Sequence, residues 1–151
     1  MTETKVAKND TIQSFQKICR DKGLKLTHQR LEIYSILASM DIHPSAEDVF
    51  EQAKQAMPTI SFDTVYRTLA LFERHDVISR VHCLDDRTRY DPTMEPHYHF
   101  ICKKCRRIQD FYWPDLDKLQ IPSDAANCGT VDGKYLELRG ICQDCLSSEN
   151  N

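Results

Sequence analysis

Apolar residues recur every three or four positions through the first half of the chain, which is the spacing of one buried helix face. The second, third and fourth of these segments open on Thr27, Ser45 and Ser61, each of which can cap a helix. The pattern therefore predicts four short helices, over residues 11–22, 27–40, 45–57 and 61–72.

Two further apolar segments follow the fourth predicted helix. Residues 78–84 and 88–91 flank the polar triplet Asp85-Asp86-Arg87, so we expect two strands that form a hairpin. Helices followed by a hairpin are typical of a winged helix-turn-helix, in which one helix enters the major groove of DNA. The first half is accordingly predicted to bind double-stranded DNA.

The second half shows shorter elements of both kinds. Residues 97–101 and 107–112 predict strands on either side of a Cys-x-x-Cys turn, and residues 116–119 predict a helical turn. Residues 134–141 alternate polar and apolar side chains, which predicts a half-buried strand. The fold class is therefore α+β, with an N-terminal winged helix-turn-helix domain and a small α/β domain after it.

The boundary between the two halves is expected at residues 91–96. Pro92 and Pro96 disfavour both a helix and a strand interior there. We predict a DNA-binding domain over residues 1–90, a hinge over 91–96 and a second domain over 97–151. A domain of only about 55 residues has a small core, which a bound metal or a second chain would have to supplement.

Composition excludes several classes of protein. Twenty Lys and Arg against 23 Asp and Glu give a net charge of −3, so the chain is not a uniformly basic nucleic-acid coat. Its four glycines are too scattered for a phosphate-binding loop. The longest hydrophobic run, residues 69–72, is too short to span a membrane, and the polar N-terminus lacks the apolar stretch of a signal peptide. We expect a cytoplasmic protein with no membrane partner.

Seven cysteines are the most unusual count in the chain. Four of them form two pairs of equal spacing, Cys102-x-x-Cys105 and Cys142-x-x-Cys145. Two such turns supply four thiolates for a closed tetrahedral site, which suits structural Zn²⁺. A redox dithiol is the alternative, but the βαβ unit that surrounds thioredoxin-like motifs is absent from the predicted elements.

The remaining three cysteines have other surroundings. Cys19 and Cys83 occupy apolar positions and are predicted to be small core residues, whereas Cys128 has no assigned role.

A second group of candidate ligands carries no sulfur. His97-Tyr98-His99 places two imidazoles on one side of a strand, close enough to bind one metal. Asp91 precedes this pair, Asp110 follows it, and His43 lies before a predicted helix of the first half. Three imidazoles and two carboxylates suit Fe²⁺ or Mn²⁺. The alternative is a helix-flanking histidine and solvated strand-end carboxylates.

With these motifs in place, the chain resembles the ferric uptake regulator family of metal-dependent repressors, from about Ile12 to Cys145. The motifs that carry the resemblance are Leu26-Thr27-His28-Gln29-Arg30, His43-Pro44-Ser45-Ala46-Glu47-Asp48, Thr64-Val65-Tyr66-Arg67-Thr68-Leu69, His97-Tyr98-His99-Phe100-Ile101-Cys102 and Gly140-Ile141-Cys142-Gln143-Asp144-Cys145. The resemblance implies a homodimer on a palindromic DNA operator. It also implies a zinc-stapled dimerisation domain and a regulatory metal between the two halves.

Within the family the chain looks most like the peroxide-responsive repressors. Asp110 stands where the iron-uptake regulators generally have Glu. The resemblance implies that the regulatory site binds Fe²⁺ or Mn²⁺, and that peroxide oxidises His43 or His97 when Fe²⁺ is bound. Loss of a ligand would then release the DNA. The regulatory ligands predicted in this way are His43, Asp91, His97, His99 and Asp110. An iron-responsive uptake regulator of the same family is the alternative.

DNA contacts are expected from the fourth helix and from a basic stretch near the N-terminus. Residues 15–35 contain five Lys or Arg against two acidic residues, a local charge of +3 that suits phosphates. An inward-packed Tyr66 and a solvated lysine face are the alternative. The predicted contacts are Thr64, Tyr66, Arg67, Lys17, Arg20 and Lys25.

Two hypotheses from other classes stay open. A metallohydrolase would use His97, His99 and Asp110 around an open metal, but no H-E-x-x-H helix supplies a general base. A zinc-ribbon interaction module would have no regulatory metal. We predict a transcriptional repressor and not an enzyme.

Overall fold

The computed structural model describes residues 3–82 and 86–149. The chain divides into two compact units, residues 1–94 and residues 95–151, each of which is described by itself. The division lies inside the segment 91–96 that the sequence marks by its prolines. Among the described residues, no helix combines the length and the apolar character that a membrane span requires.

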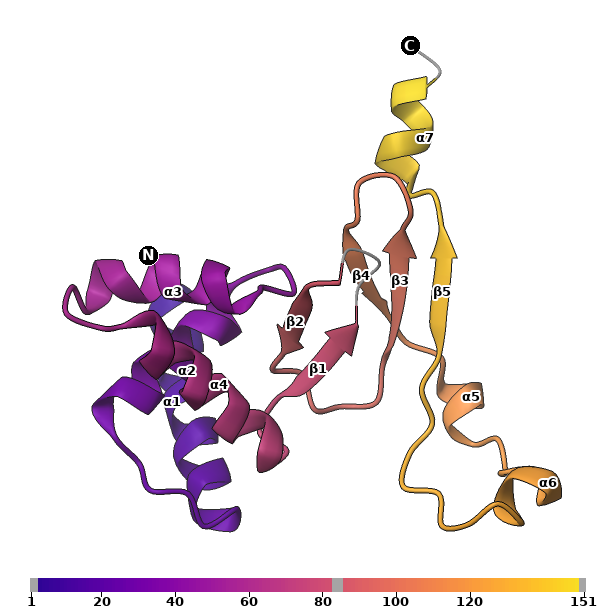
Figure 1. Cartoon of the computed structure of the whole chain (residues 1–151), viewed down its shortest axis with the longest axis horizontal. Coiled ribbons are helices and arrows are strands. Elements are labelled where there is room, and N and C mark those ends of the chain that lie inside the picture. Colours follow the sequence, from indigo (N-terminus) through magenta and orange to yellow (C-terminus); the bar gives the residue numbers. More distant parts are fainter. Residues whose placement is uncertain (1–2, 83–85, 150–151) are drawn as a thin grey trace. The chain divides into compact units, whose positions relative to one another are not determined.

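The described residues of the first unit form four helices and a two-stranded sheet (Figure 1). The helices are α1 (Glu3–Asp21), α2 (His28–Ser39), α3 (Ala46–Ala56) and α4 (Phe62–Arg74). The prediction for the first helix is wrong at its start, since α1 begins at Glu3 and not at residue 11. Residues 3–10 lack an apolar period, yet helix formers such as Lys and Ala can extend a helix that packing has already nucleated.

Side-chain caps fix where three of these helices begin. The Oγ1 atom of Thr27 accepts the N–H of Arg30 at 3.3 Å, and the Oγ of Ser61 accepts the N–H of Thr64 at 3.1 Å. Ser45 and Asp48 form a complete capping box at the start of α3. These contacts confirm the three predicted caps and satisfy amide groups that would otherwise lack partners.

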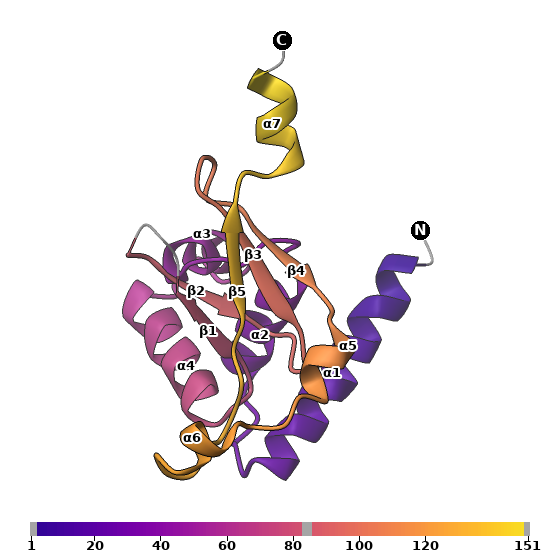
Figure 2. The ribbon, with the colours of Figure 1, turned by 90° about the vertical axis from the view of Figure 1, so that its right-hand side faces the viewer.

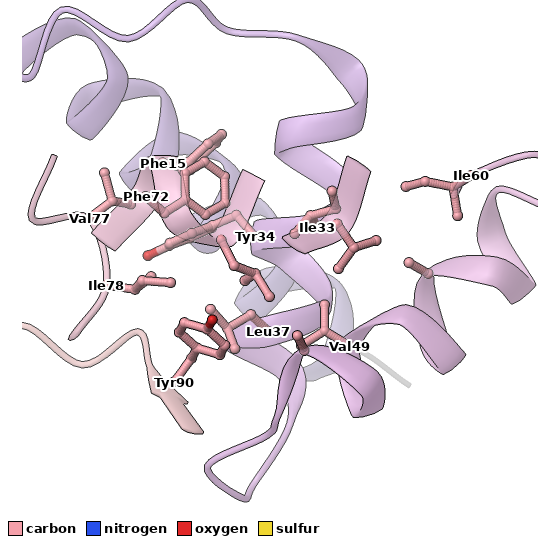
Figure 3. Packing of buried hydrophobic residues seen from close by; sticks show 14 of the residues in the cluster. Phe15, Ile33, Tyr34, Leu37, Val49, Ile60, Phe72, Val77, Ile78 and Tyr90 are labelled. Atoms are coloured by element: carbon pink, nitrogen blue, oxygen red, sulfur yellow. The ribbon is translucent and has the colours of Figure 1, made fainter. Parts of the chain in front are cut away.

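An aromatic cluster forms the centre of the first unit (Figure 3). The rings of Phe15 and Tyr34 stack with centroids 4.4 Å apart, and Phe72 meets Phe15 edge-on at 5.4 Å. These three rings join α1, α2 and α4 into one core. Cys19 is buried in the same cluster, which confirms its predicted place in the core.

Strands β1 (Ser79–His82) and β2 (Thr88–Asp91) pair antiparallel, with Arg80 opposite Tyr90. Tyr90 is buried against the helices, so the hairpin is attached to the core by its second strand. This arrangement confirms the predicted helices followed by a hairpin. Cys83, Leu84 and Asp85, which belong to the predicted strand and turn, lie outside the described residues.

The second unit is built on a three-stranded sheet with the order β4-β3-β5. Strand β3 (Tyr98–Cys102) pairs antiparallel with β4 (Ile108–Phe111) and parallel with β5 (Glu137–Gly140). Figure 2 shows β5 leading into the turn before α7 (Gln143–Glu149). The short helices α5 (Pro114–Asp117) and α6 (Ser123–Ala126) lie between β4 and β5 in the chain. Neither α6 nor α7 was predicted from the sequence.

The segment between α5 and β5 is fastened by polar contacts. The Lys134 ammonium donates to the carbonyl oxygens of Leu116, Asp117 and Leu119 at 3.1, 2.8 and 2.8 Å. The hydroxyl of Tyr98 donates to the carboxylate of Asp117. These bonds hold α5 close to the central strand, although this helix buries no residue of its own.

Buried apolar side chains are scarce in the second unit. Tyr98, Ile101, Cys102 and Cys142 are its buried apolar residues among those described. The half-buried strand predicted over 134–141 is present only over Glu137–Gly140, where Leu138 is 43% exposed, and Tyr135, which precedes the strand, is 97% exposed. Leu136 and Glu137 are partly buried, so neither row of side chains is fully covered within the described unit. Other large exposed apolar residues of this unit are Tyr112, Trp113, Leu119, Val131, Ile141 and Leu146.

We predict that Phe15→Ala destabilises the first unit by about 3–5 kcal/mol, because it removes a fully buried ring that contacts two others. Chemical denaturation followed by circular dichroism measures this loss. Gln13→Ala, an exposed position of the same helix, is the matched control and should unfold like the wild type. Equal unfolding midpoints for Phe15→Ala and the control would contradict the role given to this ring.

Candidate metal centres

The four paired cysteines converge at one end of the sheet in the second unit. Cys102 ends β3, and the parallel pairing sets it beside Gly140, two residues before Cys142. The sulfur of Cys102 lies 3.9 Å from that of Cys145, and the sulfurs of Cys105 and Cys142 are 3.7 Å apart. All four sulfurs lie within 4.8 Å of one another. The structure thus brings together the two Cys-x-x-Cys turns, here called the two knuckles, which lie far apart in the sequence.

These distances fit a tetrahedral zinc ion. Zn–S bonds of about 2.3 Å in a tetrahedron place the sulfurs about 3.8 Å apart. The two measured separations lie on either side of this value. Because all four donors are thiols, such a site is closed and leaves no position for a substrate.

Backbone amides prepare the sulfur of Cys102 to carry negative charge. The N–H groups of Cys105 and Cys142 point at this sulfur, with N–S distances of 3.5 and 3.4 Å. These hydrogen bonds lower the pKa of the Cys102 thiol to about 6. Burial and the neighbouring sulfurs raise the pKa of Cys145 to about 12. Four thiolates therefore cannot coexist here near neutral pH unless a cation compensates their charge.

Basic residues surround the first knuckle, and one of them reaches the second. The guanidinium of Arg107 pairs with the carboxylate of Asp144, which lies between Cys142 and Cys145. Arg107 therefore places a positive charge close to the sulfur cluster. Sequence patterns gave no signal for this pair, because its members are 37 positions apart.

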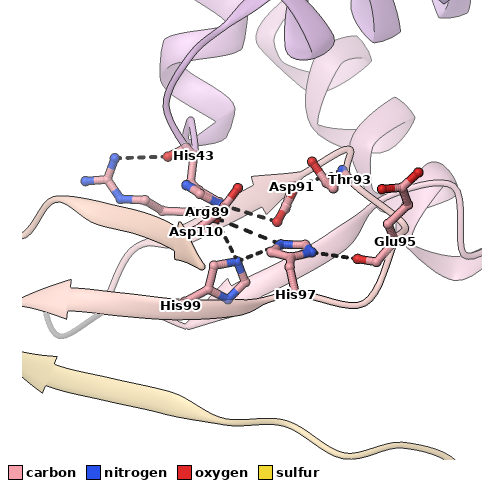
Figure 4. A network of polar contacts seen from close by, with 8 residues as sticks. All are labelled: His43, Arg89, Asp91, Thr93, Glu95, His97, His99 and Asp110. Carbon is pink, nitrogen blue, oxygen red and sulfur yellow. Dashed lines mark hydrogen bonds and ion pairs between the residues drawn. The ribbon is translucent and has the colours of Figure 1, made fainter. Parts of the chain in front are cut away.

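A second donor group in the same unit consists of His97, His99 and Asp110 (Figure 4). His99 lies opposite Asp110 in the β3–β4 register, and His97 precedes β3 by one residue. The Nε2 atoms of the two imidazoles are 3.1 Å apart. Oδ1 of Asp110 lies 3.4 Å from the Nε2 of His99 and 3.9 Å from that of His97. Donors about 2 Å from one cation and at right angles lie about 3 Å apart, so this spacing suits a shared metal.

A backbone contact orients the ring of His97. Its Nδ1 lies 2.7 Å from the carbonyl oxygen of Glu95. A carbonyl only accepts, so Nδ1 carries the proton and Nε2 presents its lone pair toward His99 and Asp110. The sequence did not reveal this contact, since a carbonyl has no residue signature.

The first unit holds a separate pair of candidate ligands. The Nε2 of His43, in the loop before α3, lies 3.3 Å from Oδ2 of Asp91 at the end of β2. The other oxygen of Asp91 accepts the N–H of Thr93 at 2.7 Å. Asp91 is buried, and a buried carboxylate requires such partners. Each unit therefore brings together its own share of the five residues that the sequence singled out.

Three of the predicted DNA contacts, Thr64, Tyr66 and Arg67, lie on α4. Tyr66 is 50% exposed, so its side chain does not pack inward. Arg67 forms an exposed ion pair with Asp63 at 2.9 Å, and the hydroxyl of Thr64 contacts the cap residue Ser61. Tyr66, Arg67 and Thr64 line a hollow of about 410 Å³ together with Arg30, Asp63, Thr68, Ala70, Leu71 and Arg74.

Lys17, Arg20 and Lys25 belong to α1 and the loop after it, and Lys17 is exposed. Lys17 lies 3.9 Å from Asp21, and Arg20 and Lys25 are also exposed. Cys128 is exposed as well, and its thiol lies 3.2 Å from the carbonyl oxygen of Asp124. Nothing in its surroundings connects Cys128 to either donor group.

Comparisons with known proteins give one consistent answer. The model of the "Ferric uptake regulator family" matches residues 21–132. The chain is 31% identical over 132 residues to the "Peroxide operon regulator" of Bacillus subtilis, covering 87% of this chain and 91% of that protein. It is 30% identical over 131 residues to the "Peroxide-responsive repressor PerR" of Staphylococcus epidermidis, covering 87% of each.

A solved structure agrees with these relatives. The ferric uptake regulator of Francisella tularensis, solved with iron, is 32% identical with a TM-score of 0.66, and the likeness covers 82% of this chain and 96% of that one. The family model spans well over half of the chain, and the relatives match along most of its length. The chain belongs to the ferric uptake regulator family.

Proposed function

We propose that this protein is a metal-dependent, DNA-binding transcriptional repressor, with a structural zinc site and a separate regulatory site for Fe²⁺ or Mn²⁺. The observation that carries the proposal is the presence of two donor groups of different chemistry, one of four sulfurs and one of nitrogen and oxygen. Membership of the family, and relatives named as peroxide-responsive repressors, support it. A repressor of this kind acts in the cytoplasm, where its DNA lies.

Zinc at Cys102, Cys105, Cys142 and Cys145 would hold the second unit together. Zn²⁺ supplies no redox chemistry, and it neutralises half of the charge of four thiolates. The two knuckles follow β3 and β5, so their joint ligation ties these strands at one end. Since the unit buries few apolar side chains, its stability should depend on this tie.

The regulatory metal would bind the five residues His43, Asp91, His97, His99 and Asp110. The first two belong to the first unit and the other three to the second. A cation bound by both sets would fix one arrangement of the units, and so favour one geometry for DNA binding. Two carboxylates balance a divalent cation, and the donor set lacks sulfur, which suits Fe²⁺ and Mn²⁺.

Peroxide sensing is the specific form of regulation that we propose. Bound Fe²⁺ would catalyse the transfer of one oxygen atom from peroxide to the imidazole of His43 or His97, and the other oxygen atom of the peroxide would leave as water. The names of the relatives support this sensing function. An oxidised ring is a poorer ligand, so the cation no longer joins the two units and the operator is released.

A second copy of this chain is the partner that we propose for the exposed apolar residues of the second unit. Tyr135, Leu138 and Ile141 lie in or beside β5, an edge strand whose outer side pairs with no described strand. Exposed apolar surface of this kind marks protein interfaces. A homodimer presents two copies of α4, which matches a palindromic DNA operator.

We propose that α4 reads the operator through Thr64, Tyr66 and Arg67. Tyr66 and Arg67 are exposed on this helix. Lys17, Arg20 and Lys25 are also exposed, and they are proposed to contact phosphates.

Replacement of one zinc ligand is expected to dismantle the second unit. Cys142→Ser should lower the zinc content from one ion per chain to near zero and convert the dimer to monomer. The free energy that zinc contributes is then lost. Elemental analysis and light scattering measure the two effects. Cys128→Ser is the matched control and should keep zinc and dimer, and a Cys142→Ser protein that kept both would disprove the structural site.

DNA binding should require the regulatory metal. We expect zinc-loaded protein to bind a palindromic operator in a gel-shift experiment only when Mn²⁺ is added, with an affinity that decreases steeply as salt rises. His99→Ala should lose the Mn²⁺ response but keep its zinc, because it removes a ligand from one group only. His75→Ala, which alters a histidine outside both groups, should respond like the wild type. Operator binding that ignores Mn²⁺ would refute the proposed regulation.

Peroxide should modify the Fe²⁺ form alone. Mass spectrometry after a peroxide pulse is expected to find 16 mass units added to the peptide that contains His43 or His97, in line with one oxygen atom. Mn²⁺-loaded protein is the control, and its peptides should keep their mass, since Mn²⁺ does not readily reduce peroxide. Unmodified histidine peptides in the Fe²⁺ form would indicate an iron-responsive uptake regulator instead.

A further inference from the structure

Each residue of the loop 43–45 makes a hydrogen bond through its backbone. The carbonyl of His43 accepts from the guanidinium of Arg89 at 3.3 Å. The carbonyl of Pro44 accepts the N–H of Tyr90 at 2.9 Å. The N–H of Ser45 donates to the carboxylate of Asp48 at 2.8 Å. The loop before α3 is thus attached to β2 on one side and to α3 on the other.

Arg89 has a second partner, at the start of α3. Its Nη1 atom, the one that reaches the His43 carbonyl, lies 4.0 Å from Oδ2 of Asp48. That oxygen also accepts the N–H and the hydroxyl of Ser45, both at 2.8 Å. The side chain of Arg89 is 20% exposed and so lies largely out of solvent, where charge-assisted contacts are stronger than at a free surface. Arg89 therefore connects β2, the second strand of the hairpin, to the capping box at the start of α3.

These contacts determine where the imidazole of His43 lies. Asp91 follows Arg89 by two residues on β2, so a strand that binds the His43 carbonyl also carries the carboxylate that faces its ring. The Nε2 of His43 lies 3.3 Å from Oδ2 of Asp91. We propose that Arg89 is a positioning residue, which holds the backbone of His43 so that the His43–Asp91 pair is preformed for a divalent cation.

The proposal rests on the regulatory site described above. It makes a separate claim about how strongly that site binds a divalent cation. A guanidinium near the site repels a divalent cation, so its charge alone weakens metal binding. If Arg89 acted through charge, its removal would strengthen Mn²⁺ binding. If it acts by positioning, its removal weakens binding, because the cation must then order a loop that is no longer held. The two explanations predict opposite signs.

Mn²⁺ titration of zinc-loaded full-length protein, followed by the electron paramagnetic resonance of free Mn²⁺, separates these explanations. We expect Arg89→Gln to raise the dissociation constant at least tenfold, the usual size for loss of a residue that orients a ligand. Arg89→Lys should recover most of this loss, because an ammonium can still donate to the His43 carbonyl. Arg80→Gln is the matched control, since this arginine of β1 pairs with Glu73 and should change binding less than twofold.

A spectroscopic readout distinguishes a misplaced ligand from a weakened fold. With saturating Co²⁺ in place of Mn²⁺, the visible absorption of Arg89→Gln should resemble that of His43→Ala and differ from that of the wild type. General destabilisation leaves the spectrum of the saturated site unchanged. If Arg89→Gln fails to fold with one zinc per chain, Arg89→Met is measured against the same criteria.

Three results would overturn the proposal. They are wild-type or tighter Mn²⁺ binding in Arg89→Gln, equal losses in the Gln and Lys variants, and a wild-type Co²⁺ spectrum in Arg89→Gln. In each case a loss of Mn²⁺ binding in His43→Ala leaves the proposed regulatory site intact. Failure of the wild type to bind Mn²⁺ at all would instead remove the regulatory site, and with it the basis for a positioning role.

Discussion

The register of β3 positions both donor groups of the second unit. Its antiparallel pairing with β4 places His99 opposite Asp110, and its parallel pairing with β5 places Cys102 beside Gly140. Side chains alternate between faces along a strand, so a slip of one residue would turn His99 away from Asp110 and separate the two cysteine knuckles. Gly140 permits the close approach, because a Cβ there would lie 3.1 Å from the ring of Phe100. The pairing of one five-residue strand thus positions both donor groups of its unit.

The parts that the sequence predicted well are those encoded over a few residues. A Cys-x-x-Cys turn and an H-x-H pair are local spacings, and the caps at Thr27, Ser45 and Ser61 depend on contacts three residues away. The contacts that it missed join distant positions. Arg89 and His43 are 46 residues apart, and no periodicity in a single sequence reports such a pair.

The exposed face of β5 shows a different limit. The alternation over 134–141 indicated a strand, which is present over 137–140, yet the burial of its apolar row depends on what covers that row. In a single chain Leu138 stays 43% exposed. A hydrophobic pattern therefore identifies a face that needs a partner, but it does not say whether that partner belongs to the same chain. The first residues of α1 were not predicted as helix for a different reason. A polar helix end leaves no apolar pattern to detect.

Charge explains why one site would be permanent and the other reversible. Four thiolates around Zn²⁺ leave a net charge of −2, which Arg107 and its basic neighbours partly offset, and the short Zn–S bonds close the site. The proposed regulatory set holds two carboxylates, so its charge with a divalent cation is near zero. Its remaining donors are neutral imidazoles, which bind Fe²⁺ and Mn²⁺ weakly enough to exchange. A switch requires this weaker site, because the cation stops joining the two units only if it can leave once a ligand is lost. The affinity of the regulatory site for the cation then depends on preformed pairs such as His43 and Asp91. Each ligand that is already in place lowers the entropic cost of ordering the site around the cation.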